Sequence, residues 1–114
     1  MKLYHVNAQQ TLVDALEMAE DRRARSRGLI GHAPLEPGQG MLIRPCRWIH
    51  TFRMSFPIDV IYVGRDWRVV ACSENLVPNR FGKPVLRSQF VIELPAGAIR
   101  RAGVQPGDRL ELRP

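Results

Sequence analysis

Apolar and β-branched residues gather in short runs along the chain, and most runs end at Gly, Pro, Asn or another turn residue. Runs of this kind are typical of strands, and about seven are recognisable. They cover residues 3–6, 15–19, 41–45, 58–63 and 68–72, a part of SQFVIELPAG at 88–97, and the end of GVQPGDRLEL at 103–112. Within residues 11–19, Leu12 and Leu16 fit both a helix and an alternating strand, so a strand is expected only for the second half.

One segment favours a helix. Residues 19–31 read AEDRRARSRGLIG, with Glu20 and Asp21 where carboxylates stabilise a helix N-terminus and Gly28 where a helix commonly stops. The arginines between them are expected on a solvated face, with Arg27 the one that turns inward.

The order of these elements predicts a mainly β fold. Short strands at turn-separated intervals, with only one convincing helix, are typical of a closed or two-layered β domain. Residues 58–63 and 68–72 are expected to form a hairpin across the turn RDW. We therefore expect residues 1–114 to form a single β-barrel or β-sandwich domain with one or two short helices.

Composition agrees with one self-sufficient domain. The chain has 114 residues, of which 45% are hydrophobic, enough to bury a core without disulfides or a metal. No apolar run approaches the roughly 18 residues of a membrane helix, and the start MKLYHVNAQQ lacks a signal-peptide pattern. Cys46 and Cys72 have no CxxC spacing and are expected as small buried hydrophobes. The sequence predicts a cytoplasmic protein with no membrane partner and no cofactor.

The net charge of +6 raises the question of nucleic-acid binding, because arginine binds phosphate well. The arginines are scattered, however, and no aromatic-plus-basic stacking motif is visible in the sequence. Specific nucleic-acid binding is therefore not expected. A basic surface for nucleic acid or another anion is retained as a third hypothesis, through Arg22, Arg23, Arg25, Arg100 and Arg101.

The stretch IHTFRMSFPIDVIYV at 49–63 holds the first candidate chemistry. If residues 49–56 are extended, His50, Phe52, Met54 and Phe56 share one face, and the histidine lies on an apolar stripe. Asp59 then stands alone in an apolar strand. An unpaired buried carboxylate is so costly that a partner is expected.

Glu93 is likewise a carboxylate within an apolar strand, between Ile92 and Leu94. With His50 and Asp59 it would make a set of one histidine and two carboxylates that suits a metal ion, although no closely spaced metal signature is present. Alternatively, the two carboxylates accept hydrogen bonds from turn amides or from an arginine such as Arg27. No nucleophile-elbow motif is present.

Five segments in order, RSRGLIGH, GQGMLI, IHTFRMSFPIDVIYV, FVIELPAG and GVQPGDRLEL, resemble the bacterial and archaeal DUF192 family, an uncharacterised domain, from about residue 17 onward. The resemblance implies a mostly β barrel or sandwich and no established activity. By motif match it places Asp59, Glu93, Gly97 and the corner Arg27-Gly28-Leu29 at a common site. It also matches His50, Thr51, Met54 and Pro57 to a His-Thr-x-x-Met pattern before Pro-x-Asp. In another branch a tryptophan replaces this histidine, which argues against a family-wide chemical role for His50.

The chain departs from the family pattern at the hairpin turn, where Asp66-Trp67 stands in place of the common Asp-Gly. Trp67 is expected either to fold back onto the domain or to be exposed as an anchor for a partner.

These observations favour a non-catalytic binding domain. A shallow polar pocket is expected around Asp59, with Glu93, His50, Thr51 and Arg27 near it. Its ligand would be a small polar molecule, such as a carbohydrate, or a loop of a protein partner. The alternative is a metal-assisted hydrolase that uses His50, Asp59 and Glu93.

Overall fold

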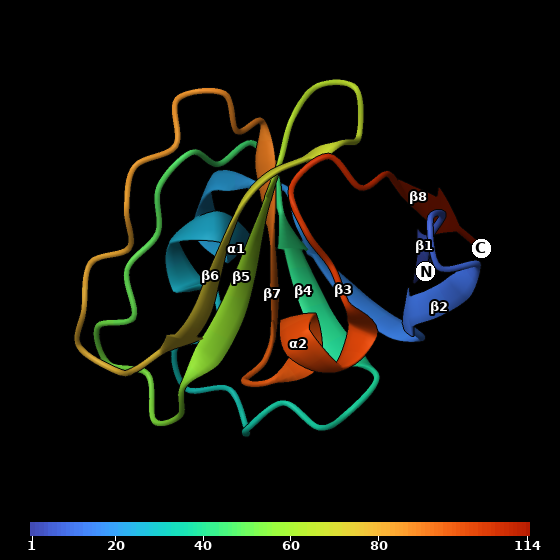
Figure 1. Ribbon diagram of the computed structural model, residues 1–114. Coiled ribbons are helices and arrows are strands. Elements are labelled where there is room, and N and C mark those ends of the chain that lie inside the picture. Colours follow the sequence, from blue (N-terminus) through green and yellow to red (C-terminus); the bar gives the residue numbers. More distant parts are fainter.

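The computed structural model describes residues 1–114 as eight strands in two sheets with two short helices (Figure 1). One sheet has the strand order β3-β4-β7-β5-β6 and the other has the order β2-β1-β8. The bounds are β1 Lys2–His5, β2 Gln10–Val13, β3 Ala15–Ala19, α1 Arg22–Arg27, β4 Gln39–Ile43, β5 Ile58–Val63, β6 Val69–Leu76, β7 Phe90–Pro95, α2 Ala98–Ala102 and β8 Leu110–Arg113. The mainly β prediction is confirmed; the two sheets do not close into a barrel.

The centre of the five-stranded sheet is buried on both faces. Strands β5 and β7 lie at its centre, and every residue of β5 is buried, which explains why IDVIYV is continuously apolar apart from Asp59. Strands β3 and β4 run parallel, because the connection between them is long enough to return across the sheet and carries α1. All other neighbours are antiparallel.

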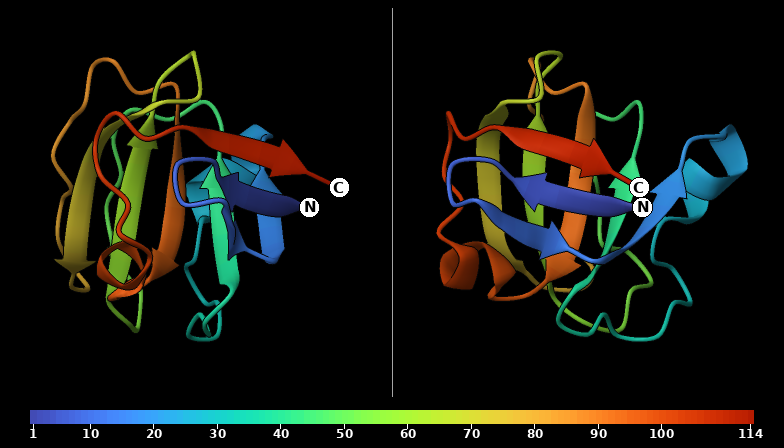
Figure 2. Two further views of the ribbon diagram at one scale, coloured as in Figure 1. Left: turned by 45° about the vertical axis from the view of Figure 1, so that its right-hand side comes forward. Right: turned by 90° about the vertical axis from the view of Figure 1, so that its right-hand side faces the viewer.

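Two apolar cores lie on the two faces of this sheet. The first fills the space towards the three-stranded sheet and α2, and it includes Leu3, Ile92, Ile99 and Leu110. Figure 2 shows the three-stranded sheet crossing in front of the larger one. The second core lies on the other face, beneath α1 and two long loops. It includes Leu29, Met54, Phe56, Val60 and Tyr62.

Helix α1 forms where the sequence predicts it. The Asp21 side chain accepts a hydrogen bond from Ala24 N at 2.8 Å as the N-cap, and Gly28 ends the helix with φ of 48°. Arg27 is exposed, so its predicted inward turn is wrong; Arg25 is the half-buried arginine of the helix. Neither helix has the length and apolar character needed to cross a bilayer.

The hairpin of β5 and β6 contains the turn in which Asp66-Trp67 replaces the common Asp-Gly. Gly64 and Arg68 close it through a backbone hydrogen bond of 2.9 Å, and Trp67 adopts φ of 65°. Its indole folds back onto Phe90, with ring centroids 4.5 Å apart. Trp67 therefore takes the backbone conformation that glycine supplies elsewhere, and packing against the first core stabilises it there.

Residues 44–57 and 77–89 form two long loops that run side by side, coloured green and orange in Figure 1. We call them the paired loops. Backbone hydrogen bonds join them, from Thr51 N to Arg80 O at 2.8 Å and from Gly82 N to Ile49 O at 2.9 Å. Residues 49–56 are not extended, so the apolar stripe that an extended segment would give does not form: Arg53 has φ of 66°, and Thr51 and Met54 are both buried although alternation puts them on opposite faces.

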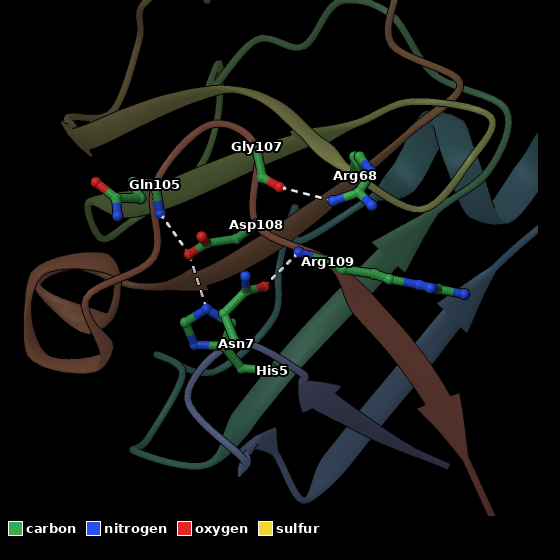
Figure 3. A network of polar contacts seen from close by, with 7 residues as sticks. All are labelled: His5, Asn7, Arg68, Gln105, Gly107, Asp108 and Arg109. Atoms are coloured by element: carbon green, nitrogen blue, oxygen red, sulfur yellow. Dashed lines mark hydrogen bonds and ion pairs between the residues drawn. The ribbon is translucent and has the colours of Figure 1, made fainter.

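A polar network ties the three-stranded sheet to the turn before β8 (Figure 3). His5 Nε2 and Asp108 Oδ2 lie 2.8 Å apart in a buried pair, and the same oxygen accepts a hydrogen bond from Gln105 N at 3.0 Å. Asn7 accepts from Arg109 N at 2.7 Å. These contacts join the N-terminal part of the chain to the C-terminal part, and we assign them a role in stabilising the fold.

Candidate functional site

Asp59 is fully buried in β5 and its carboxylate is completely engaged by backbone amides. Oδ1 accepts a hydrogen bond from Asn75 N at 2.8 Å, and Oδ2 accepts from Gly97 N and Ile99 N, both at 3.0 Å. Gly97, another residue singled out by the sequence, has φ of 93°, and a Cβ there would lie 2.6 Å from Arg101 Nη1. Asp59 thus fixes the start of α2 and an irregular point of β6, which is a structural role.

Glu93 points to the opposite face of the same sheet. In the antiparallel register of β5 and β7, Asp59 lies opposite Leu94 and Glu93 lies opposite Val60. Directly opposed residues share a face, and successive residues alternate between faces. Leu94 belongs to the first core and Val60 to the second. The sheet therefore separates the two carboxylates, and the predicted trio of His50, Asp59 and Glu93 is not brought together.

No group of three or more His, Cys, Asp or Glu side chains is arranged to hold a metal ion anywhere in the chain. The donor set that the hydrolase hypothesis needs is therefore not assembled by the fold.

Glu93 forms part of a cavity of about 560 Å³ beside α1, which we call the Glu93 cavity. Its walls come from the end of α1, the following turn, β4, and both paired loops. Of the residues singled out in the sequence, it contains His50 and Glu93, the corner Arg27-Gly28-Leu29, and Met54. Asp59 and Thr51 do not line it, so the pocket expected around Asp59 is centred on Glu93 instead.

Thr51 and His50 belong to the paired loops. The Thr51 hydroxyl donates to Val77 O at 2.6 Å and accepts from Arg80 N at 3.0 Å, so it holds the two loops together. His50 is exposed, and its Nδ1 accepts a hydrogen bond from Phe52 N at 3.2 Å. Pro57 is exposed immediately before β5.

Glu93 is only 3% exposed, and its Oε1 atom has no hydrogen-bond partner. Burial disfavours the charged form and raises the pKa of this carboxyl to about 7. The group therefore changes between a neutral acid, which can donate or accept, and a carboxylate, which only accepts, near neutral pH. A buried polar atom without a partner is unusual in a native fold, and in a residue that lines a cavity it marks a place for a ligand donor.

Arg25 and Cys46 also line the cavity, although the sequence suggested other roles for them: an anion-binding surface for Arg25 and a buried apolar position for Cys46. The Arg25 guanidinium reaches Pro45 O at 3.5 Å, whereas its buried Nε has no partner. Burial raises the pKa of the Cys46 thiol, which donates a hydrogen bond to Trp48 O at 3.3 Å. Cys46 is therefore held as a protonated thiol and is a poor nucleophile.

The remaining cavity residues were not identified from the sequence and come from α1, the turn after it, β4 and the paired loops: Ser26, Ile30, Ile43, Pro45, Arg47, Trp48, Ile49, Ser88 and Gln89. Arg47 and Trp48 are exposed, like Arg27. The cavity thus combines one buried acid with three guanidinium groups, of which those of Arg27 and Arg47 are exposed. That arrangement can hold a ligand with a hydrogen-bond donor at one end and an anionic or acceptor group at the other.

The arginines of the third hypothesis do not form one surface. Arg22, Arg23 and Arg25 lie on α1, which covers the second core, while Arg100 and Arg101 lie on α2, which packs on the first. Figure 2 shows the two helices on opposite sides of the molecule. The predicted five-arginine patch is therefore divided between two faces.

Comparison with known proteins gives a family and two solved structures. The family model DUF192, described as uncharacterised, matches residues 4–112. A crystal structure of a protein of unknown function from Novosphingobium aromaticivorans DSM 12444 is 26% identical, with a TM-score of 0.84, over 97% of this chain and 82% of that one. A crystal structure of a candidate transcription regulator from Sinorhizobium meliloti 1021 is 30% identical, with a TM-score of 0.78, over 96% and 89% of the two chains. No curated protein matches the chain.

Proposed function

Since the chain belongs to the DUF192 family of uncharacterised proteins, we propose that it is a non-catalytic binding domain whose ligand site is the Glu93 cavity. The unpaired Oε1 atom of Glu93 carries the proposal. A buried acceptor without a partner lowers the stability of the free protein, and a ligand donor that reaches it recovers the missing hydrogen bond. Binding is the simplest use of such a group when no nucleophile or metal set accompanies it.

The size and charge of the cavity define the ligand class. A volume of about 560 Å³ is in the range of small-molecule sites. Glu93 calls for an ammonium or hydroxyl donor, whereas Arg25, Arg27 and Arg47 favour a carboxylate, phosphate or other acceptor at the far end. Amino acids and sugar acids have this combination, and neutral sugars satisfy the Glu93 end alone. A polar loop of a partner protein is the alternative occupant.

The cytoplasm is the location that we propose for this binding domain. Cys46 and Cys72 are both free thiols, which suits a reducing compartment.

A thermal-shift screen with amino acids, polyols and sugar acids tests the proposal. We expect at least one of these compounds to raise the melting temperature of the wild-type protein, and the rise to disappear in Glu93→Leu, which removes the carboxyl without leaving a buried polar group unpaired. Glu93→Gln keeps the shape of the side chain and takes the place of Glu93→Leu in the screen if the leucine variant does not fold. Glu111→Gln changes an exposed carboxylate on β8 and is the matched control.

The proposal is wrong if a compound stabilises the Glu93 variants as much as the control, or if the whole screen leaves the wild-type melting temperature unchanged.

A further inference from the structure

All charged side chains of the paired loops are basic. Residues 44–57 and 77–89 contain no Asp or Glu, yet they hold six cationic side chains: Arg44, Arg47, Arg53, Arg80, Lys83 and Arg87. Arg44 is paired with Glu20, with Nη2 and Oε2 2.7 Å apart. The other five are exposed and take part in no ion pair. The rest of the chain has eleven basic and eleven acidic side chains, so the net charge of +6 resides on these loops.

Three aromatic rings accompany these cations. Trp48 and Phe81 are stacked, with centroids 5.2 Å apart and an interplanar angle of 11°, although the residues are 53% and 60% exposed. Phe52 meets Phe81 edge-on at 4.7 Å. Exposed aromatic rings that gather in one place commonly mark an interaction surface.

The aromatic group is held in place by the backbone of both loops. The Trp48 indole donates a hydrogen bond to Gly82 O at 2.6 Å, and His50 and Phe81 form an isolated β-bridge. A Cβ at Gly82 would lie 3.0 Å from the Ile49 side chain and 3.1 Å from the Tyr62 hydroxyl, so the loops approach each other closely here. The rings are thus fixed before any partner arrives, which lowers the entropy cost of binding.

We propose that the paired loops bind single-stranded nucleic acid, with bases stacking on the outer faces of the Trp48 and Phe81 pair and with the surrounding arginines contacting phosphates. A single strand has unpaired bases, which stack on aromatic rings, and phosphates, which contact cationic side chains. The paired loops present both kinds of group side by side. An acidic peptide would satisfy the cations but leave the ring faces unused, and duplex DNA would keep its bases stacked on each other. Because stacking is tolerant of base identity, this binding needs no sequence specificity.

This surface was not visible in the sequence because its parts come from two segments that only the fold brings together. Arg47 and Trp48 belong both to this surface and to the Glu93 cavity, but Phe52, Arg53, Phe81, Arg80 and Arg87 do not line that cavity. Variants at these residues test the nucleic-acid proposal without disturbing the proposed ligand site.

Fluorescence anisotropy with a labelled oligothymidylate of about 20 nucleotides, measured over a series of NaCl concentrations, provides the test. Each phosphate neutralised on a single strand contributes a slope of about −0.7 to log K against log salt. Changing Arg53, Arg80 and Arg87 together to glutamine should therefore reduce the magnitude of the slope by about 2. Changing Arg22, Arg23 and Arg101 to glutamine removes the same charge elsewhere and should leave most of the slope in place.

The stacking part is tested at Phe81. Phe81→Leu keeps apolar bulk but removes the ring, and we expect it to weaken oligothymidylate binding about tenfold, while Phe81→Trp should retain it. The proposal fails if no binding is detected at 50 mM NaCl, if duplex DNA of the same length binds equally well, or if the two triple variants lose affinity equally. It also fails if vesicles containing phosphatidylserine bind the wild type but the oligonucleotide does not.

Discussion

Two carboxylates stand one on each face of the same sheet, and their surroundings give them different roles. Asp59 accepts three backbone hydrogen bonds, whereas Glu93 has an oxygen with no partner and opens onto a cavity. A fully satisfied buried group stabilises the fold, and an unsatisfied one is available for binding. The function that we propose therefore lies with Glu93.

The raised pKa of Glu93 predicts how stability depends on pH. Its carboxyl ionises near pH 4.5 in the unfolded chain and at about 7 in the folded protein. In that window the folded state binds the extra proton, so its stability falls as pH rises, and the loss is complete above pH 7. Relative to Glu93→Gln, which stays neutral, the wild-type free energy of unfolding should fall by roughly 2 to 3 kcal/mol between pH 4.5 and pH 8.

Urea unfolding of both proteins at the two pH values measures this difference, because all other titrating groups cancel in the comparison. A difference that does not change with pH would show that Glu93 is ionised normally and is not held neutral by burial.

Asp59→Asn tests the structural role of Asp59. The asparagine side chain has one oxygen in place of two, so at least one of the three amide donors now faces an NH2 group. We expect the free energy of unfolding to fall by roughly 2 to 4 kcal/mol. Urea denaturation measures the change, and Asp14→Asn at an exposed position should stay within about 0.5 kcal/mol of wild type. Unchanged stability in Asp59→Asn would contradict the role assigned here.

At the level of elements, the strands and α1 could be predicted because local chemistry determines them. The apolar run IDVIYV matches β5, and Asp21 with Gly28 sets the two ends of α1. The paired loops could not be predicted, because no regular pattern governs them and long-range bonds such as Thr51 to Val77 determine their path.

The hairpin turn gives a prediction about backbone conformation. Both Trp67→Gly and Trp67→Ala lose the packing of the indole on Phe90, and we expect each to be less stable than wild type by roughly 1 to 3 kcal/mol. Because position 67 has φ of 65°, the glycine variant should be more stable than the alanine variant by about 1 kcal/mol. Thermal unfolding compares the two. Alanine equal to or better than glycine would contradict a left-handed backbone at this position.

The site was only partly predictable, because long-range contacts also decide which side chains meet there. A carboxylate between Ile92 and Leu94 is visible in the sequence, but the face to which it points depends on the register of β5 and β7. Arg25 and Cys46 carry no sequence signal that places them beside Glu93. Register and loop path, which arise from packing across the whole domain, decide which side chains share the cavity.

For the molecule as a whole, the net charge of +6 predicts a response to salt. Like charges crowded on the paired loops repel each other, and salt screens this repulsion. Raising NaCl from about 20 mM to about 300 mM should increase the melting temperature by roughly 2 to 5 °C. The increase should be smaller when Arg53, Arg80 and Arg87 are changed to glutamine than when Arg22, Arg23 and Arg101 are changed. If both triple variants show the same rise in melting temperature, the repulsion between charges is not concentrated on the paired loops.

The most direct test of the central claim, that Glu93 forms the base of a ligand site, is an amide NMR titration of the labelled protein with the amino acids, polyols and sugar acids named above. We predict that the compounds that bind shift the resonances of Glu93, Cys46, Leu29 and their cavity neighbours, and leave Asn75, Gly97 and Ile99 around Asp59 unchanged. Shifts centred on the Asp59 amides, or no saturable shift with any compound, would contradict the account.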